Sequence, residues 1–230
     1  MTENEARSLL VSTAAKYIGY SEASGKHKQI IDIYNARTPL PRNYKVTYTD
    51  AWCATYVSSM AILCGMANII PRECSCYYQV EQFQRMERWC EDDNHVPSAG
   101  DIIYYDWQDS GVGDDTGVPD HVGIVEKVAH GTITVIEGNY KDSVERRFIS
   151  IGAKNIRGYG LPNFKWWAEQ KTKEEKPVAD KNEPSEWAKE AWEWAKRVGI
   201  TDGLRPKENA TRQEVITFLY RYSKGGNANG

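Results

Sequence analysis

Residues 120–139, DHVGIVEKVAHGTITVIEGN, contain the pattern that decides the fold. Two runs rich in β-branched residues, 121–128 and 132–137, are separated by a turn signal, which is typical of paired short strands. Segments of similar texture at 102–107 and 147–151 flank this pair. Because short strands follow one another without intervening helices, the sequence predicts an antiparallel sheet.

Helical patterns precede these strands. Thr2 and Glu5 form a capping box that opens a first helix. A later helix is expected to begin at Thr49 or Asp50, either of which is a good N-cap residue. Helices followed by strands indicate an α+β domain, which we expect to span residues 1–166.

The composition changes at the end of this domain. Residues 167–184 are dense in Lys, Glu and Pro and have almost nothing to bury, so they are predicted to be a linker. Residues 185–224 carry two short helical patterns, the second opened by a capping box at Thr211 and Glu214. A module of about 40 residues buries little surface, so we expect it to dock on a partner or on a second copy. The apolar positions of its two helices are Trp187, Ala191, Trp194, Val215, Phe218, Leu219 and Tyr222.

Charge and composition exclude several classes of partner. The net charge is −3 and the pI about 5.9, so no global field points to nucleic acid or to an anionic membrane. The short basic cluster Arg146-Arg147 is interpreted as a solvated face. No apolar stretch approaches the ~18 residues of a membrane helix, and the polar N-terminus predicts no secretory signal. The five cysteines are therefore expected to be free thiols in a reducing cytoplasm.

Cys53 is the candidate nucleophile. If its helix starts at Thr49 or Asp50, Cys53 lies in the first turn, where unpaired backbone N–H groups and the positive helix end lower the pKa of a thiol. The thiolate is the reactive form of cysteine. A lone cysteine more often packs as a small buried hydrophobe, so the interpretation needs a base nearby.

His121 is the candidate base, because it opens a predicted strand next to a loop rich in Gly and Asp. Glu137 ends the next strand and Asn139 follows two positions later. In an antiparallel pair, either side chain lies within reach of His121 and is able to accept its second ring N–H. That bond fixes the tautomer that takes the Cys53 proton.

These motifs resemble a known family. The pattern WCA-x-x-V-S on a helix, P-x-x-G-D-I-I before a strand, H-V-G-I-V and E-G-N is similar to the CHAP group of papain-like peptidases and amidases, which is related to the NlpC-type cell-wall hydrolases. The resemblance covers residues 5–164. It implies a papain-like CHAP fold with Cys53 as nucleophile, His121 as base, and Glu137 or Asn139 as the group that orients the histidine.

By the same resemblance, the protein cleaves an amide bond of bacterial peptidoglycan, as a cysteine-dependent endopeptidase or an N-acetylmuramoyl-L-alanine amidase. The sequence leaves open which amide bond is cut. Two alternatives stay open as well. One is a non-catalytic wall-binding or structural protein on a papain-like scaffold. The other is a cytosolic cysteine peptidase or acyltransferase that shares the Cys–His pair.

The C-terminal module resembles an S-layer homology motif through W-A-x-x-A-x-x-W-A, G-I-T-D-G, T-R-x-E and L-Y-R. That resemblance implies binding of secondary cell-wall polymer, for which Trp187 and Arg212 are the candidate residues. Such motifs usually occur in threes, so homo-oligomerisation through this single copy is an equal alternative. The whole arrangement resembles a phage or prophage endolysin, which is made in the host cytoplasm and reaches the wall through a holin pore.

Weaker signals concern metals and substrate contacts. We expect no cofactor, although the Asp-rich loop from Asp106 to Asp120 suits calcium if it is more than a solvated loop. Trp52 and Trp107 are predicted to contact substrate, against the more frequent fate of aromatic residues in the core. The remaining cysteines, Cys64, Cys74, Cys76 and Cys90, contain no Cys-x-x-Cys pair, so they are expected to be buried free thiols rather than a zinc site. Serine variants of Cys64, Cys74 and Cys76 are expected to keep activity.

Overall fold

The structure is a computed structural model that describes residues 1–92, 94–108, 117–175, 183–204 and 208–224. It divides into two compact units, Met1–Thr172 and Lys173–Gly230, which are described separately. Among the described residues, no helix combines the length and the hydrophobicity needed to cross a membrane.

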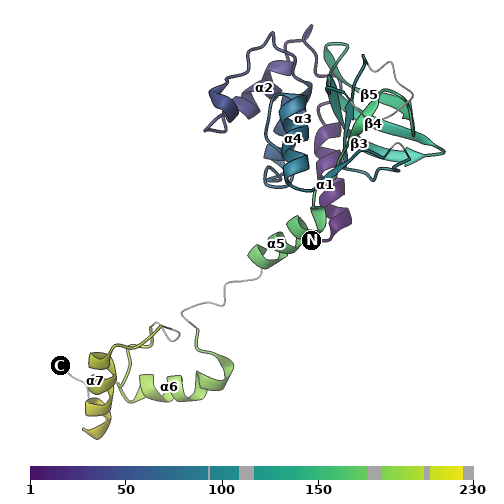
Figure 1. Ribbon diagram of the computed structural model, residues 1–230. Helices are drawn as coiled ribbons and strands as arrows, with labels where there is room; N and C mark the ends of the chain where they lie inside the picture. Colours follow the sequence, from purple (N-terminus) through teal and green to yellow (C-terminus); the bar gives the residue numbers. More distant parts are fainter. Residues whose placement is uncertain (93, 109–116, 176–182, 205–207, 225–230) are drawn as a thin grey trace. The chain divides into compact units, whose positions relative to one another are not determined.

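The first unit begins with helices and continues with strands (Figure 1). Thr2 and Glu5 form both bonds of the predicted capping box, which confirms the first helix. The helices of this unit are α1 (Glu3–Ala15), α2 (His27–Asn35), the 3₁₀ helix η1 (Pro41–Asn43), α3 (Cys53–Leu63), α4 (Cys76–Arg85) and the start of α5 (Phe164–Glu175).

Among the described residues, six strands form one sheet in the order β1-β6-β2-β3-β4-β5, with antiparallel neighbours throughout. The predicted α+β class with an antiparallel sheet is therefore confirmed, and it is compatible with a papain-like CHAP fold. The strands are β1 (Trp89–Cys90), β2 (Ile102–Tyr105), β3 (His121–Ala129), β4 (Thr132–Tyr140), β5 (Ser143–Ser150) and β6 (Ile156–Gly160).

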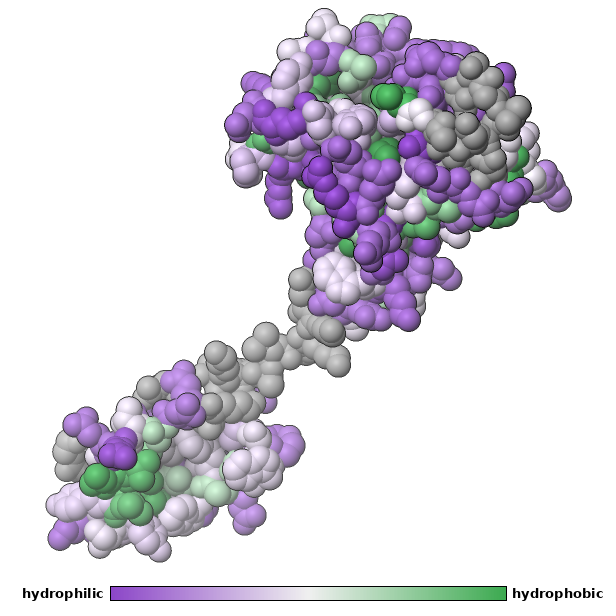
Figure 2. Space-filling model, in the orientation of Figure 1, coloured by the Kyte–Doolittle hydropathy of each residue, from purple (hydrophilic) through white to green (hydrophobic). Residues whose placement is uncertain are grey.

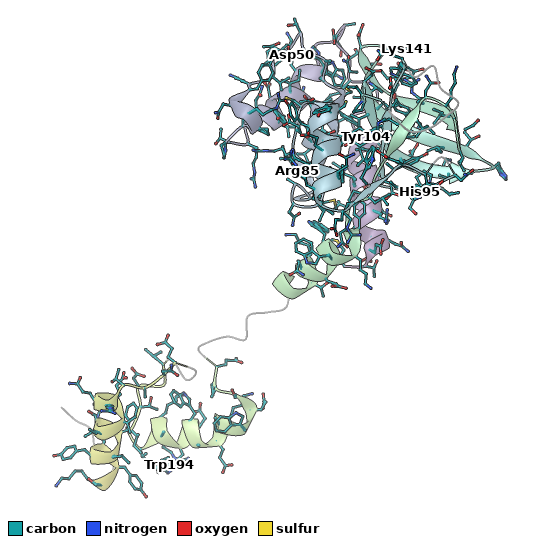
Figure 3. The ribbon with its side chains drawn as sticks, in the orientation of Figure 1. Asp50, Arg85, His95, Tyr104, Lys141 and Trp194 are labelled. Atoms are coloured by element: carbon teal, nitrogen blue, oxygen red, sulfur yellow. The ribbon has the colours of Figure 1, made fainter. Side chains whose placement is uncertain are left out.

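Strand alternation divides the buried residues between two clusters. Ile102 and Tyr104 of β2 belong to the larger cluster, which also contains the core residues of α1, α2, α3 and α4. Ile103 and Tyr105 belong to the smaller cluster, which is built from β2, β3, β4 and β6. Figure 3 shows Tyr104 at the junction between sheet and helices, where its hydroxyl donates to Gln79 of α4 at 3.1 Å.

Helix α3 is buried along nine consecutive residues, from Cys53 to Ala61. It packs against β3 and β4, and Gly138 makes the close approach to β4 sterically feasible. A Cβ atom at Gly138 would lie 2.4 Å from Cβ of Tyr56 in α3. The glycine of the E-G-N motif thus allows the nucleophile's helix to approach the strand that carries Glu137.

The linker begins later than the composition predicts. Helix α5 continues to Glu175, and both Trp167 and Ala168 are 2% exposed in the core of the first unit. The indole N–H of Trp167 donates to the Gly65 carbonyl at 2.9 Å. Residues 167–184 are rich in Lys and Glu, and their average composition does not show that Trp167 and Ala168 are buried. A helix can bury one side while its other side is charged.

The second unit contains η2 (Glu186–Ala188), α6 (Lys189–Arg197) and α7 (Arg212–Ser223). Thr211 and Glu214 form the predicted capping box of α7. None of the described residues in these three helices is buried, and Figure 2 shows strongly hydrophobic residues gathered on the surface of this unit. The ring centroids of Trp194 and Tyr222 lie 6.0 Å apart in an edge-to-face contact, which joins α6 to α7.

Candidate active site

Cys53 is the first residue of α3, so it lies in the first helical turn, as the sequence predicts. The helix starts later than expected, because the Asp50 carboxylate accepts from the Thr47 N–H and the Tyr44 hydroxyl instead of capping α3. Trp52 occupies the N-cap position without a side-chain cap bond. The first backbone N–H groups of α3 therefore have no side-chain cap acceptor, and they face the end of the helix where Cys53 lies.

The pKa of the Cys53 thiol lies well below its usual value. The main cause is a hydrogen bond from Cys76; burial opposes the shift, and the His121 ring and the Ala54 N–H lower the pKa further. Because the thiol is only 5% exposed, its negative charge depends on these partners rather than on water. Cys53 is thus set up as a thiolate.

His121 opens β3 and pairs with Tyr105 of β2. Its ring is stacked on Tyr105 with centroids 5.9 Å apart, and Trp107 lies 6.3 Å away on the same side of the site. Burial by itself lowers the pKa of His121, but the hydrogen bonds and charges of Cys53 and Glu137 outweigh it and raise the pKa to about 9. The two pKa shifts together favour the thiolate–imidazolium form of the pair.

Glu137 contacts the His121 ring, as the sequence predicts for an orienting group. The Nε2–H of the imidazolium donates to Oε2 of Glu137 at 2.9 Å, which leaves Nδ1 for the Cys53 sulfur. Glu137 is completely buried, and Gly123 in the H-V-G motif provides the space for its side chain. A Cβ atom at Gly123 would lie 2.7 Å from Cγ of Glu137.

Asn139 has a different position. It lies at the irregularity of β4 between Glu137 and Tyr140 and has a positive φ of 57°. Among the described residues, no hydrogen bond joins Asn139 to His121. Such an irregularity changes the direction of side chains relative to a regular strand. The structure thus brings together Cys53, His121 and Glu137, and not the fourth predicted residue.

Arg147 is a site residue that the sequence interpretation missed. Its Nε–H donates to both carboxylate oxygens of Glu137, at 2.8 and 2.9 Å. The guanidinium lies 3.9 Å from the ring centroid of Tyr140 and 4.7 Å from that of Trp107. The interpretation of Arg146-Arg147 as a solvated face is therefore wrong for Arg147. Strand alternation was the available signal, because consecutive residues of β5 point to opposite faces.

The two predicted substrate-binding tryptophans have different surroundings. Trp52 is completely buried; its indole N–H donates to Glu22 at 3.0 Å, and His27 lies against its ring. It is a core residue, so the prediction that it contacts substrate is wrong. Trp107 is 40% exposed, is stacked on Tyr105 and lies beside His121, so it stays the candidate substrate contact.

The predicted calcium loop falls largely outside the described residues, which exclude 109–116. Of its flanking carboxylates, Asp106 accepts from the Gln108 N–H and Asp120 from the Trp107 N–H. Within the described part of the chain, no cluster of three His, Cys, Asp or Glu side chains is suited to a metal. Calcium at this loop stays a prediction.

Cys76 is the second thiol of the site. It begins α4, is 7% exposed, and its sulfur lies 3.7 Å from the sulfur of Cys53. The expectation that a Cys76 variant keeps activity stays a prediction, and the structure adds that this cysteine contacts Cys53. Cys64 and Cys74 are buried or half-buried thiols whose pKa is raised by burial.

The pKa shifts predict how activity depends on pH. If the thiolate–imidazolium pair is the active form, kcat/KM rises with pH as Cys53 ionises well below the usual thiol range, and falls as His121 loses its proton near pH 9. The measurement is wall hydrolysis across pH, with the alkylation rate of Cys53 as a substrate-independent control. A rate that climbs with an ordinary thiol pKa of about 8.5 contradicts the pair.

Arg147→Met is expected to lower kcat/KM on the order of 10- to 100-fold, because a lost charged hydrogen bond to a buried group costs about 1–3 kcal/mol. Without the guanidinium charge, Glu137 stabilises the imidazolium more strongly, so the basic limb of the pH profile should move to higher pH. Arg147→Lys should restore part of the rate. Arg146, the neighbour of Arg147 in β5, pairs with the partly exposed Glu126 of β3, so Arg146→Met is the matched control. Equal behaviour of the two methionine variants contradicts the role of Arg147.

One known family matches the part of the chain that contains these residues. Residues 43–139 match the family model described as CHAP domain, a span that contains Cys53, His121, Glu137 and Asn139 but covers less than half of the chain. This part of the chain is thus similar to CHAP domains, which are typically hydrolases that act on peptidoglycan. The searches of curated proteins and of solved structures gave no match.

Proposed function

We propose that the protein hydrolyses an amide bond of bacterial peptidoglycan through a covalent acyl-enzyme on Cys53. The observation that carries the proposal is the chain of contacts from the Cys53 thiolate through His121 to Glu137 and Arg147. A nucleophile, a base and an orienting carboxylate in hydrogen-bond contact are the parts that amide hydrolysis requires.

The reaction begins when the Cys53 thiolate attacks the carbonyl carbon. A C–S bond forms and the carbonyl electrons move to oxygen, where the unpaired backbone N–H of Cys53 stabilises the oxyanion. His121 then protonates the amine nitrogen as the C–N bond breaks. In the second half, neutral His121 takes a proton from water, the hydroxide attacks the thioester, and the Cys53 thiolate leaves.

Purified cell walls are the substrate that tests this proposal. Mass spectrometry of the soluble products identifies the cleaved bond, because each bond leaves different new termini. A new muramic-acid end indicates an amidase, and a new amino terminus within stem or bridge peptides indicates an endopeptidase. Intact walls after incubation with wild-type protein, together with release of an unrelated peptide, would favour a cytosolic peptidase instead.

We further propose that the protein acts as an endolysin whose second unit directs it to the wall, with Trp187 and Arg212 as contacts for secondary wall polymer. Trp187 is 89% exposed and Arg212 is the first residue of α7. Trp192 and Arg221 line a cavity of about 570 Å³ in the same unit, which offers a stacking surface and a cation to a charged saccharide.

Removal of the second unit is expected to abolish pelleting with purified walls while leaving hydrolysis of soluble fragments intact. The truncated protein must keep residues through Glu175, because α5 contributes Trp167 and Ala168 to the first core. Light scattering of both forms tests the alternative, self-association through the exposed apolar face. If the full-length protein is a monomer and does not pellet with walls, the second unit has neither the wall-binding role nor the self-association role.

A further inference from the structure

Two helices present cysteines to the same point of the site. Cys53 is the first residue of α3 and Cys76 is the first residue of α4, and their sulfur atoms lie 3.7 Å apart. Amide hydrolysis needs one nucleophilic thiol, so Cys76 forms no covalent bond in the steps given above, although its hydrogen bond lowers the pKa of Cys53. Both thiols are buried within the same cluster, which places them in contact with each other rather than with solvent.

The two thiols differ in pKa, as an attacking and a resolving cysteine do. Cys76 has a pKa well above its usual value, because it hydrogen-bonds to Cys53, is buried and lies near the charges of Cys53 and Asp120. Cys76 therefore stays protonated and donates its S–H to the Cys53 thiolate. A reactive thiolate beside a second thiol is the arrangement of an attacking and a resolving cysteine.

We propose that Cys53 and Cys76 are a modification site, at which a peroxide converts the two thiols to a reversible disulfide. The inactivation that follows rests on the proposed function, in which Cys53 is the nucleophile. The disulfide removes the thiolate and leaves His121 without its partner, so the oxidised protein has no nucleophile for the amide carbonyl.

The proposed chemistry is balanced with hydrogen peroxide as the oxidant. The Cys53 thiolate attacks one peroxide oxygen, the O–O bond breaks, and hydroxide leaves and takes a proton to become water. The sulfur of Cys76 then attacks the sulfenic acid of Cys53, the S–O bond breaks, and hydroxide leaves with the Cys76 proton as a second water. The two thiols lose two electrons to the peroxide, and an added dithiol returns them.

The local structure permits the two sulfurs to approach. A disulfide requires an S–S distance of about 2.05 Å, so the contact must shorten by rotation of the side chains and a small shift of the helix ends. Trp52 and Ser75, the N-cap residues of α3 and α4, make no side-chain cap bond that such a shift would break.

Peptide mapping of the full-length protein tests the linkage independently of activity. Trypsin cleaves after Lys45, Arg72 and Arg85, so Cys53 shares a peptide with Cys64, and Cys76 shares one with Cys74. The double variant Cys64→Ser, Cys74→Ser leaves a single thiol on each peptide. After treatment with one equivalent of hydrogen peroxide and alkylation, we expect the two peptides to be joined and to separate on reduction. Unlinked peptides with Cys53 oxidised to sulfinic acid would overturn the proposal.

Recovery of activity is the second measurement, with each variant compared with its own untreated sample. Wild type and the matched control Cys74→Ala should lose wall hydrolysis in peroxide and regain most of it in dithiothreitol. Cys76→Ala should lose it permanently, because a sulfenic acid without a resolving thiol oxidises further. If Cys76→Ala fails to fold, the same measurement is made on Cys76→Ser, which is nearly isosteric with the wild type. Recovery of a Cys76 variant equal to wild type would contradict the resolving role.

The two measurements separate this proposal from the proposed function. Linked peptides in a protein that never hydrolyses walls would leave the disulfide standing and refute the hydrolase. Wall hydrolysis by a protein that never forms the Cys53–Cys76 link would support the hydrolase and refute the disulfide.

Discussion

Cys53→Ser is expected to lower wall hydrolysis on the order of 10⁴-fold or more, because the serine hydroxyl is not ionised at neutral pH and cannot replace the thiolate. The substitution is nearly isosteric, so the buried start of α3 should keep its packing and the melting temperature should change little. The measurement is clearing of purified walls, with circular dichroism of the same sample.

Cys64→Ser is the matched control for this variant. Cys64 is a buried thiol at the opposite end of the same helix, where burial raises its pKa. It should keep activity apart from the stability cost of burying a hydroxyl. Clearing by Cys53→Ser at the rate of wild type would remove Cys53 from the mechanism.

His121→Ala is expected to be as damaging as loss of Cys53, because the thiolate and the imidazolium act as one unit. The variant also raises the thiol pKa, since the ring's hydrogen bond and charge both lower it in the wild type. The alkylation rate of Cys53 at pH 7 should therefore fall together with wall hydrolysis. A double variant at Cys53 and His121 should lose little more than either single variant.

Glu137→Gln separates orientation from proton transfer. The amide still reaches the His121 ring but lacks the charge that helps to raise its pKa, so activity should fall less than in His121→Ala and the basic limb should move to lower pH. Asn139→Ala should have the smallest effect, because Glu137 alone contacts the ring among the predicted partners. Asn139→Ala with a loss equal to that of His121→Ala would contradict this assignment.

The sequence predicts the parts of the fold whose signals are local. The capping boxes at Thr2 and Thr211 mark α1 and α7 correctly, because a cap is formed by residues three positions apart. Strand β6 is absent from the predicted strands, because Gly158 and Gly160 are residues of low strand propensity. Both glycines are required by packing instead, as a Cβ at Gly160 would lie 2.4 Å from the Phe83 ring.

The residues of the candidate site likewise divide into those with a local sequence signal and those without one. Cys53, His121 and Glu137 lie in short motifs that carry their own context, and the structure brings them together. Arg147 and Cys76 reach the site only through the register of β5 and the position of α4. No spacing along the chain reveals such contacts, because they depend on tertiary packing. The prediction for Trp52 failed for the opposite reason. Trp52 precedes Cys53 in the sequence, which suggested a contact with substrate, but its side chain is completely buried at the N-cap position of α3.

The two glycines beside Glu137 set a condition for transplanting this chemistry. A designer who grafts Cys53, His121 and Glu137 onto another antiparallel sheet also has to reproduce two missing side chains. A side chain at position 123 would occupy the space of the Glu137 side chain. A side chain at position 138 would keep α3, which carries Cys53, too far from β4. The catalytic geometry is therefore specified by empty volume as much as by reactive atoms.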